Sequence, residues 1–381
     1  MRIGMIFSTP FPPQEGIGFY VWNLSRWLVS QGHEVHLITR GGLFSDQYIT
    51  PEGIFVWKPC FLPLYPFHVQ FHNLFVNRLT HQLENKLDLF HLHSPLVKMP
   101  QTGLPTIATI HSPIKGYSRA VKVSDIYSLL IKLQTPFSLR VETELMHRVH
   151  RLTTVANTVR REFTEYGINP QRVAVLGNGV DIDLFKPAQI LMPNDQPMYV
   201  LTVGRLAPRK GLEDLIQSAK IVLKYYPNLR FIILGEGPLR PNLQRLVTQL
   251  NLEDSVFLLG HVHQRTRLIS YYQHCMMYVH PSHYEGLPTS LLEAMACGRP
   301  VIAAAVSGNL DIIENQKNGL LVPPHQPEQL ADAILNLIAK PTLAQQMGVE
   351  ARATVCHHYS WNVVGERYLH EYQALLGESK K

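Results

Sequence analysis

Residues 2–40, RIGMIFSTPFPPQEGIGFYVWNLSRWLVSQGHEVHLITR, carry the pattern on which the fold prediction rests. The apolar run RIGMIFS ends in a proline-rich turn, which is typical of a strand covered on both faces of its sheet. The next segment repeats apolar residues at helical spacing, and Gly32 stands where that helix is expected to end. HEVHLITR again has the pattern of a strand. A strand, a helix and a strand within about forty residues predict a βαβ unit with a parallel sheet and a right-handed crossover.

The same alternation continues in the first half of the chain and restarts in the second. Further strands are expected at LDLFHLH, PTIATIH, RLTTVA and RVAVLGN, and later at YVLTVG, RFIILG, VFLLG, MMYVHP and RPVIAAA. Residues 181–198 hold three prolines and little periodicity, so we place a linker there. We therefore predict an α/β protein of two Rossmann-like, doubly wound parallel-sheet domains that face each other across a cleft. The first comprises residues 1–184, with the C-terminal helix 361–381 packed back on it, and the second comprises residues 185–360.

The composition is that of a globular protein rather than a disordered or membrane-spanning one. Of the 381 residues, 45% are hydrophobic and 17% are charged. No apolar run approaches the roughly 18 residues of a membrane span, and the N-terminus lacks a signal-peptide pattern, so a cytoplasmic protein is expected. The four cysteines form no zinc spacing. The net charge of +6 suits an anionic partner, and no nucleic-acid-binding module is recognisable.

A basic loop in the second half is a candidate anion site. In TVGRLAPRKGLEDLI, Arg205 and Lys210 follow a predicted strand, and a helix is expected to begin near Leu212. Two cations beside a helix N-terminus attract an anion, because free backbone N–H groups and the helix dipole add to the charge. A diphosphate fits such a site. A solvated basic loop is the alternative.

The stretch HYEGLPTSLLEAMACGRPVIA, residues 283–303, places two glutamates around a helix start. A helix is expected from about Pro288 to Cys297, because proline suits a first turn and glycine follows the end. Glu285 then lies in the preceding turn beside Gly286, and Glu293 lies within the helix. Two carboxylates of this kind suit the hydroxyl groups of sugars. The alternative is that both are ordinary turn and helix residues.

Taken together, VGRLAPRKG, LGEGPLR, YEGLPTSLLEAMACGRPVIA and NGLLVPP resemble, in this order, the family-4 retaining glycosyltransferases of GT-B fold. The similarity covers nearly the whole chain and is densest over residues 170–325. It implies that Arg205 and Lys210 hold the diphosphate of a nucleotide-sugar donor. It also implies that Glu285 contacts the hydroxyls of the sugar and that Glu293 contacts the ribose.

The resemblance assigns further contacts to backbone groups and to one histidine. The amides of Gly286 and Leu287 would lie near the sugar and phosphate, and the backbone near Val262 would meet the nucleobase. In QEGIGFYVWNL, Gly16 and Gly18 match the family's glycine-rich loop, whose amides approach the phosphate or the acceptor. His111, at the end of TIATIH, matches a histidine that approaches the donor sugar.

Two departures from the family pattern stand out. The usual double glycine of the first loop is Glu15-Gly16 here, which weakens the assignment of that first position. Asp311 stands where the family commonly has a glutamate, and its role is left open.

The resemblance implies a retaining transfer that needs little acid–base machinery and no cofactor. The two cations would stabilise the charge on the departing diphosphate, so no obligatory metal is expected. A nucleotide-sugar epimerase or hydrolase and a non-catalytic sugar-nucleotide-binding protein remain as alternatives. An NAD oxidoreductase is disfavoured, because no GxGxxG follows the first strand. The acceptor is open: a glycan, a small molecule, or a lipid, since the aromatic segment CFLPLYPFHVQFHNLF and the basic segment 115–161 suit an anionic membrane surface.

Overall fold

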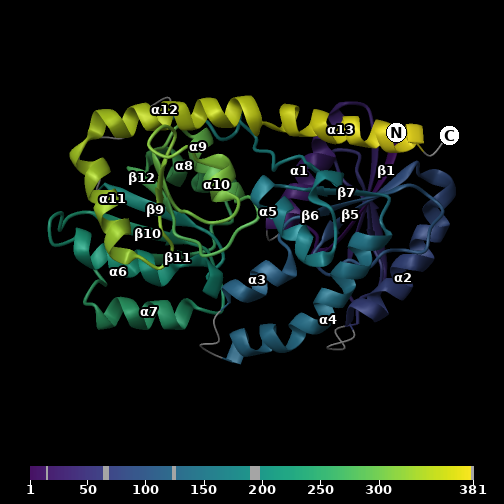
Figure 1. Ribbon diagram of the computed structural model, residues 1–381, viewed down its shortest axis with the longest axis horizontal. Coiled ribbons are helices and arrows are strands. Elements are labelled where there is room, and N and C mark those ends of the chain that lie inside the picture. Colours follow the sequence, from purple (N-terminus) through teal and green to yellow (C-terminus); the bar gives the residue numbers. More distant parts are fainter. Residues whose placement is uncertain (14–15, 63–67, 122–125, 189–197, 379–381) are drawn as a thin grey trace. The chain divides into compact units, whose positions relative to one another are not determined.

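The computed structural model describes residues 1–13, 16–62, 68–121, 126–188 and 198–378. The chain divides into two compact α/β units, whose elements are labelled in Figure 1. The first unit comprises Met1–Arg119, Leu129–Gly179 and Trp361–Lys381, and the second comprises Ala120–Ser128 and Val180–Ser360. The boundary between the units therefore follows Gly179, and the C-terminal segment belongs to the first unit.

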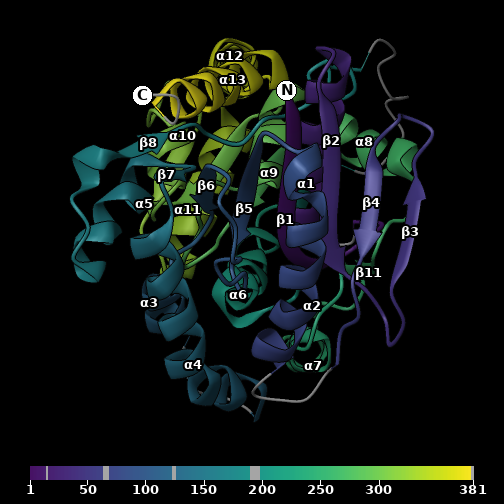
Figure 2. The same cartoon turned by 90° about the vertical axis from the view of Figure 1, so that its right-hand side faces the viewer.

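The first unit contains an eight-stranded sheet in the order β3-β4-β2-β1-β5-β6-β7-β8. Neighbouring strands are parallel except β3 and β4, which form an antiparallel pair at one edge, visible beside β2 in Figure 2. The strands are β1 (Arg2–Pro10), β2 (Glu34–Arg40), β3 (Asp46–Ile49), β4 (Phe55–Lys58), β5 (Leu89–Ser94), β6 (Thr106–Ile110), β7 (Arg151–Thr154) and β8 (Val173–Val175). The strand order reverses between β1 and β5, which is where open α/β sheets bind ligands.

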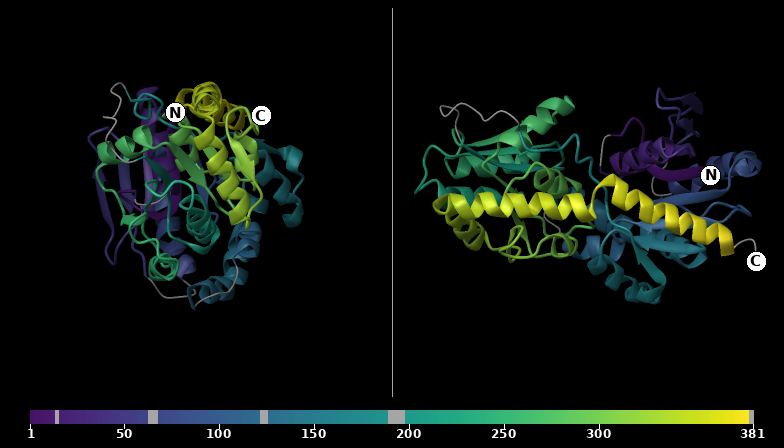
Figure 3. Two further views of the ribbon diagram at one scale, coloured as in Figure 1. Left: turned by 90° about the vertical axis from the view of Figure 1, so that its left-hand side faces the viewer. Right: turned by 90° about the horizontal axis from the view of Figure 1, so that it is seen from above.

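The helices of the first unit cover this sheet and include the C-terminal helix. They are α1 (Gly16–Ser30), α2 (His68–Leu83), α3 (Ile114–Ala120), α4 (Ile126–Arg148), α5 (Asn157–Glu162) and α13 (Trp361–Glu378), with short 3-10 turns η1 (Glu84–Lys86), η2 (Phe163–Tyr166) and η3 (Pro170–Arg172). Helix α13, at the yellow end of the chain in Figure 3, packs closely on α1. A Cβ on Gly365 would lie 2.3 Å from the Trp27 ring, so only glycine permits this approach. The Trp27 indole also donates to Asn362 over 3.0 Å.

The second unit contains a six-stranded sheet in the order β11-β10-β9-β12-β13-β14. All neighbouring strands are parallel. The strands are β9 (Tyr199–Val203), β10 (Arg230–Leu234), β11 (Val256–Gly260), β12 (Met277–His280), β13 (Val301–Ala304) and β14 (Leu320–Val322). The strand order reverses between β9 and β12, so the loops that follow these two strands lie next to each other.

The longer helices of the second unit bury apolar side chains in the core of this unit. The helices of the unit are η4 (Pro208–Lys210), α6 (Leu212–Val222), α7 (Arg240–Gln249), α8 (Arg265–His274), α9 (Thr289–Ala296), α10 (Asn309–Ile312), α11 (Pro327–Ala339) and α12 (Pro341–His358). The core joins fully buried residues of the strands, such as Phe231 and Val279, to Leu215 and Ile216 of α6 and Ile334 of α11. Burial of such side chains stabilises the unit by about 1.5–3 kcal/mol each.

The predicted fold class is confirmed, and the quoted strands all form. Gly32 ends α1 with φ of 79°, in the left-handed conformation expected of glycine after a helix. The antiparallel β3–β4 pair was not foreseen, because these strands are only four residues long and lack a strong alternation. Most of the predicted linker 181–198 lies outside the described residues. Within the part of the chain that is described, no helix combines the length and apolarity that a membrane crossing requires.

Candidate active site

Two loops at the reversal point of the second sheet hold the charged residues singled out in the sequence. The loop after β9 carries Arg205 and Lys210, and the loop after β12 carries Glu285. The two strands pair in parallel, with Tyr278 beside Leu201, so both loops leave the same edge of the sheet. This adjacency brings together side chains that are about seventy-five positions apart in the sequence.

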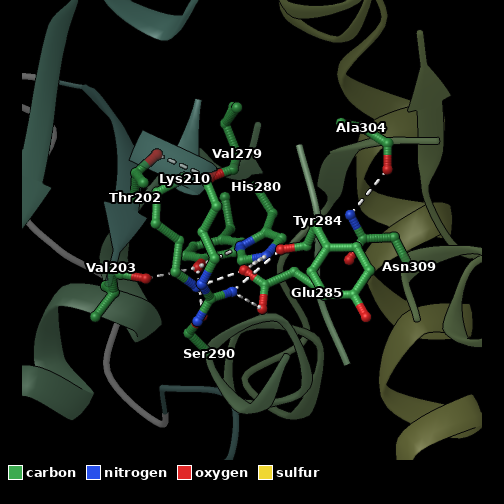
Figure 4. Close-up of polar contacts among 12 residues, drawn as sticks. Thr202, Val203, Lys210, Val279, His280, Tyr284, Glu285, Ser290, Ala304 and Asn309 are labelled. Atoms are coloured by element: carbon green, nitrogen blue, oxygen red, sulfur yellow. Dashed lines mark hydrogen bonds and ion pairs between the residues drawn. The ribbon is translucent and has the colours of Figure 1, made fainter. Parts of the chain in front are cut away.

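The Glu285 carboxylate lies at the centre of a cluster of basic side chains (Figure 4). One carboxylate oxygen, Oε1, pairs with Lys210 Nζ and lies 3.3 Å from Nε2 of His280. The other, Oε2, lies 2.8 Å from Nη1 of Arg209, which also donates to the Tyr284 carbonyl over 3.1 Å. Both oxygens of the carboxylate are therefore engaged, which fixes its orientation.

The cluster holds more positive than negative charge in a nearly dry place. Only 6% of the Glu285 side chain is exposed, compared with 13% for Lys210 and 25% for Arg209. Burial alone would raise the pKa of Glu285, but the nearby Arg209, Lys210 and His280 outweigh it and hold that pKa well below its usual range. Two cations thus face one carboxylate. The surplus positive charge favours an anionic ligand at this edge of the sheet.

Neighbouring side chains fix the strand ends from which the cluster projects. The Tyr278 hydroxyl lies 3.2 Å from the Val203 carbonyl, 2.9 Å from Oγ of Ser290 and 3.4 Å from Nδ1 of His280. Thr202 donates to the Val279 carbonyl over 2.8 Å, which ties β9 to β12 (Figure 4). These bonds orient the His280 ring and pin the first turn of α9 against the end of the sheet.

Two glycines allow the loops to approach each other closely. Gly211, with φ of 59°, directly precedes α6, and a Cβ there would lie 2.1 Å from the Pro281 carbonyl oxygen. Gly308 follows β13, and a Cβ there would lie 1.7 Å from the Gly286 carbonyl oxygen. Any larger residue would force the loop that carries Glu285 to move. Both glycines therefore help to set the position of the carboxylate.

Glu293 lies on α9, within the helix that the sequence predicted, and its side chain is half-buried. Its Oε2 accepts a 2.8 Å hydrogen bond from the Tyr272 hydroxyl. Burial raises the pKa of Glu293 to about 7, although the Tyr272 hydroxyl and the Arg265 guanidinium oppose this. Once ionised, the Glu293 carboxylate is a strong hydrogen-bond acceptor. A ligand hydroxyl group that donates to it would favour the ionised form.

The remaining predicted residues of the second unit lie along the same edge of the sheet. Arg205 is exposed in the loop after β9, and half-buried Val262 follows β11. Gly286 and buried Leu287 follow Glu285 directly, ahead of the first turn of α9. The backbone N–H groups of such a first turn point outward from the helix and suit an oxygen-rich ligand.

The first unit places His111 at the end of β6 within a buried group of histidines. His111 is 7% exposed, its Nε2 lies 3.3 Å from Nδ1 of His93, and its ring packs edge-on to Tyr20. His91 extends the group: its Nδ1 lies 2.7 Å from the Tyr372 hydroxyl of α13. Burial lowers the pKa of His111 to about 3. The imidazole is therefore neutral at physiological pH and can act only as a neutral donor or acceptor of a hydrogen bond.

The glycine-rich segment corrects one detail of the sequence analysis. Gly16 and Gly18 lie in the first turn of α1 rather than in a loop ahead of it, because the helix begins at Gly16. Gly16 is exposed, whereas buried Gly18 packs on Pro13 and Thr9. Their N–H groups remain helix-terminal donors, since the first four amides of a helix have no partner within it. Glu15 lies outside the described residues.

Three members of the site were missed in the sequence. Arg209 directly precedes Lys210, His280 ends β12, and Tyr272 faces Glu293 from α8. The doublet Arg209-Lys210 was a visible signal. Nothing in the sequence distinguished His280 among nineteen histidines. Asp311, whose role was left open, lies in α10, where its carbonyl accepts a 3.0 Å hydrogen bond from the Tyr359 hydroxyl.

Comparison with known proteins matches both units to one family. The model of the glycosyl transferases group 1 matches residues 186–354, and the model of Glycosyltransferase Family 4 matches residues 15–184. One relative is the D-inositol 3-phosphate glycosyltransferase of Acidothermus cellulolyticus, which is 28% identical over 96% of this chain and 87% of its own length.

Two solved structures show the same fold over nearly the whole chain. The sucrose-phosphate synthase of Thermosynechococcus elongatus has a TM-score of 0.84 and 23% identity, covering 99% of each chain. HepE of Anabaena, in complex with UDP-glucose, has a TM-score of 0.75 and 20% identity, covering 98% of this chain and all of its own. The two family models show that the chain belongs to glycosyltransferase family 4, and the likeness to these solved structures shows its GT-B fold.

Proposed function

We propose that this glycosyltransferase moves a hexose-type sugar, with retention of configuration, from a nucleotide-diphosphate sugar to a hydroxyl acceptor. The observation that carries the proposal is the buried cluster of Glu285 with Arg209, Lys210 and His280. Its surplus positive charge suits a diphosphate, and its carboxylate suits sugar hydroxyls. The UDP-glucose bound by the related HepE is a donor of this class.

Each predicted residue has a defined task in this proposal. Lys210, with Arg205 and the newly recognised Arg209, binds the diphosphate. Glu285 orients the sugar ring, and Glu293 accepts from the ribose hydroxyls. The backbone of Gly286, Leu287 and Val262 contributes amide donors to the donor's sugar, phosphate and base. His111, Gly16 and Gly18 are carried over from the family resemblance.

The chemistry then depends mainly on charge stabilisation. The acceptor oxygen bonds to the anomeric carbon on the face from which the diphosphate leaves, while the bond from that carbon to the phosphate oxygen breaks. The acceptor's proton passes to the departing phosphate oxygen. Cations fixed beside that oxygen stabilise the transition state more than the bound donor, and loss of one such group typically lowers the rate 10²–10³-fold. No cofactor is involved, and turnover should survive removal of divalent metals with EDTA.

A donor screen combined with product analysis tests the proposal. UDP-, GDP- and ADP-sugars are added in a thermal-unfolding assay, where a donor at 100 times its Kd should stabilise the fold by about 2.7 kcal/mol. Turnover is then measured with candidate acceptors, and NMR of the product gives the anomeric configuration. Release of free or epimerised sugar without an acceptor would favour a hydrolase or an epimerase instead.

A pair of matched variants separates catalysis from binding alone. Lys210→Ala should abolish most turnover, whereas Lys317→Ala, which alters an exposed ion pair with Glu314, should leave it unchanged. If no donor stabilises the protein, or if Lys210→Ala retains full turnover, the proposed function is wrong.

We further propose that α4 rests on an anionic membrane to reach a lipid-type acceptor. Leu129, Leu133 and Phe137 recur every four residues along this helix and are 45%, 63% and 44% exposed, with exposed Arg140 one turn further on. Apolar side chains beside a cation suit an anionic bilayer surface. The predicted aromatic segment, residues 60–75, lies partly outside the described residues. The protein should float with liposomes that contain anionic lipid, and Leu133→Gln should reduce the bound fraction. Absence of binding at low salt would reject this contact.

A further inference from the structure

A second cluster of ligand-type side chains lies beside the charged cluster but takes no part in the proposed transfer. It consists of Asp214 in the first turn of α6, His283 in the loop after β12, and His325 in the turn between β14 and α11. Among the described residues, these three are the His, Cys, Asp and Glu side chains that lie close enough together to hold a metal ion. Three segments far apart in the sequence thus present one imidazole or carboxylate each to a common point.

The distances within the cluster are those of a site that needs little rearrangement. Nε2 of His283 lies 2.7 Å from Oδ2 of Asp214, and the centroids of the His283 and His325 rings are 3.6 Å apart. One ligand atom from each residue lies within 4.8 Å of the other two. In a tetrahedral zinc site with bonds near 2.0–2.1 Å, ligand atoms stand about 3.3 Å apart. The distance between His283 Nε2 and Asp214 Oδ2 would therefore increase by about half an ångström when the ion replaced the proton that they share.

The surroundings favour binding of an ion from solution. Asp214 and His283 are half-buried, which restricts their motion, whereas His325 is exposed. His325 adopts a φ of 60°, a conformation that few residues with a side chain take, and its ring lies against that of His283. Three protein ligands leave a fourth position for water at the exposed side.

The ligand set selects the kind of metal. Two imidazoles and one carboxylate suit Zn²⁺, Co²⁺, Ni²⁺ or Cu²⁺, whereas Mg²⁺ and Ca²⁺ prefer oxygen ligands throughout. We propose that Asp214, His283 and His325 form a binding site for a zinc-class divalent cation. The ion ties α6 and the turn before α11 to the loop that carries Glu285. This site is close to the proposed donor-binding residues, because the backbone N–H of His283 donates to the Arg209 carbonyl over 2.8 Å.

Metal binding can be measured without any sugar or acceptor. Metal-free protein is titrated with Zn²⁺ by calorimetry and with Co²⁺ by visible absorption, which reports tetrahedral imidazole and carboxylate coordination. The expected result is one saturable site per chain, a raised unfolding temperature with Zn²⁺, and no competition from a large excess of Mg²⁺. The absence of a saturable site in the wild type would overturn the proposal.

Two variants and a control locate the ion. His325→Asn removes the imidazole but tolerates the positive φ, so the fold should be retained. Asp214→Asn removes the carboxylate from the half-buried side of the site. Each should weaken Zn²⁺ binding at least tenfold, while His357→Ala, at an exposed histidine of α12, should bind like the wild type. If both site variants bind Zn²⁺ with wild-type affinity, the ion binds elsewhere and the assignment is wrong.

Discussion

Replacing Glu285 with glutamine tests the charge balance on which the proposed site depends. The substitution keeps the shape of the side chain but removes the negative charge between Arg209 and Lys210. At 2.8 Å, a charge pair such as Arg209–Glu285 interacts by about 6 kcal/mol at an effective dielectric constant near 20, before desolvation is subtracted. Removing one partner of a buried pair leaves a net loss of about 3 kcal/mol.

The loss should appear in the unfolding of the second unit. For a unit of this size, about 3 kcal/mol lowers the unfolding temperature by roughly 6–12 °C, which differential scanning calorimetry resolves. Glu314→Gln is the matched control, because Glu314 and its partner Lys317 are 67% and 57% exposed. That control should stay within about 0.5 kcal/mol of the wild type.

Addition of inorganic pyrophosphate makes the test specific to the site. In Glu285→Gln the two cations lack their carboxylate, so the anion should restore more stability to this variant than to the wild type. Turnover should still be lost, because the sugar ring has lost its acceptor. The reasoning is refuted if Glu285→Gln unfolds at the wild-type temperature, or if pyrophosphate stabilises both proteins equally.

Burial and close packing lead to three further predictions. Burial raises the pKa of Glu293 to about 7, and only the ionised carboxylate accepts fully from ribose hydroxyls. The affinity for a nucleotide-diphosphate sugar, measured by calorimetry, should therefore rise about tenfold from pH 6 to pH 8 in the wild type. In Glu293→Gln the affinity should not change with pH. His91, His93 and His111, the buried histidine group beside Tyr20, have lowered pKa values. Their contribution to stability is complete above about pH 6.5 and is lost as the pH falls towards the folded-state pKa, which is about 3 for His111. From these three histidines, the free energy of unfolding should fall by about 4 kcal/mol between pH 7.5 and pH 5.5, and His111→Asn should remove about a third of that fall. Tryptophan fluorescence in urea reports the unfolding, because all four tryptophans lie in the first unit. Gly308→Ala places a Cβ 1.7 Å from the Gly286 carbonyl oxygen, so it should destabilise the second unit by about 1–3 kcal/mol in calorimetry. Gly377→Ala is the control and should not destabilise the protein, because the space around Gly377 is open. Equal stability of the two variants would contradict the packing argument.

The sequence by itself determined the local elements and the placement of chemistry at strand ends. Buried parallel strands read as continuous apolar runs, so β1, β9 and β12 were recognisable, and turn glycines and prolines marked where α6 and α9 begin. Lys210 and Glu285 could be assigned to the same edge of a sheet, because parallel strands end on one side.

Only the tertiary structure decided which loops meet. The pairing of β9 with β12 brings Arg209 and His280 onto Glu285, and strand order is a long-range property that no local pattern encodes. The same holds for the packing of α13 on α1 and for the cluster that includes His283. Each depends on contacts between segments tens to hundreds of residues apart. Such contacts form because apolar faces must be buried, and periodicity shows which face is apolar but not which partner covers it.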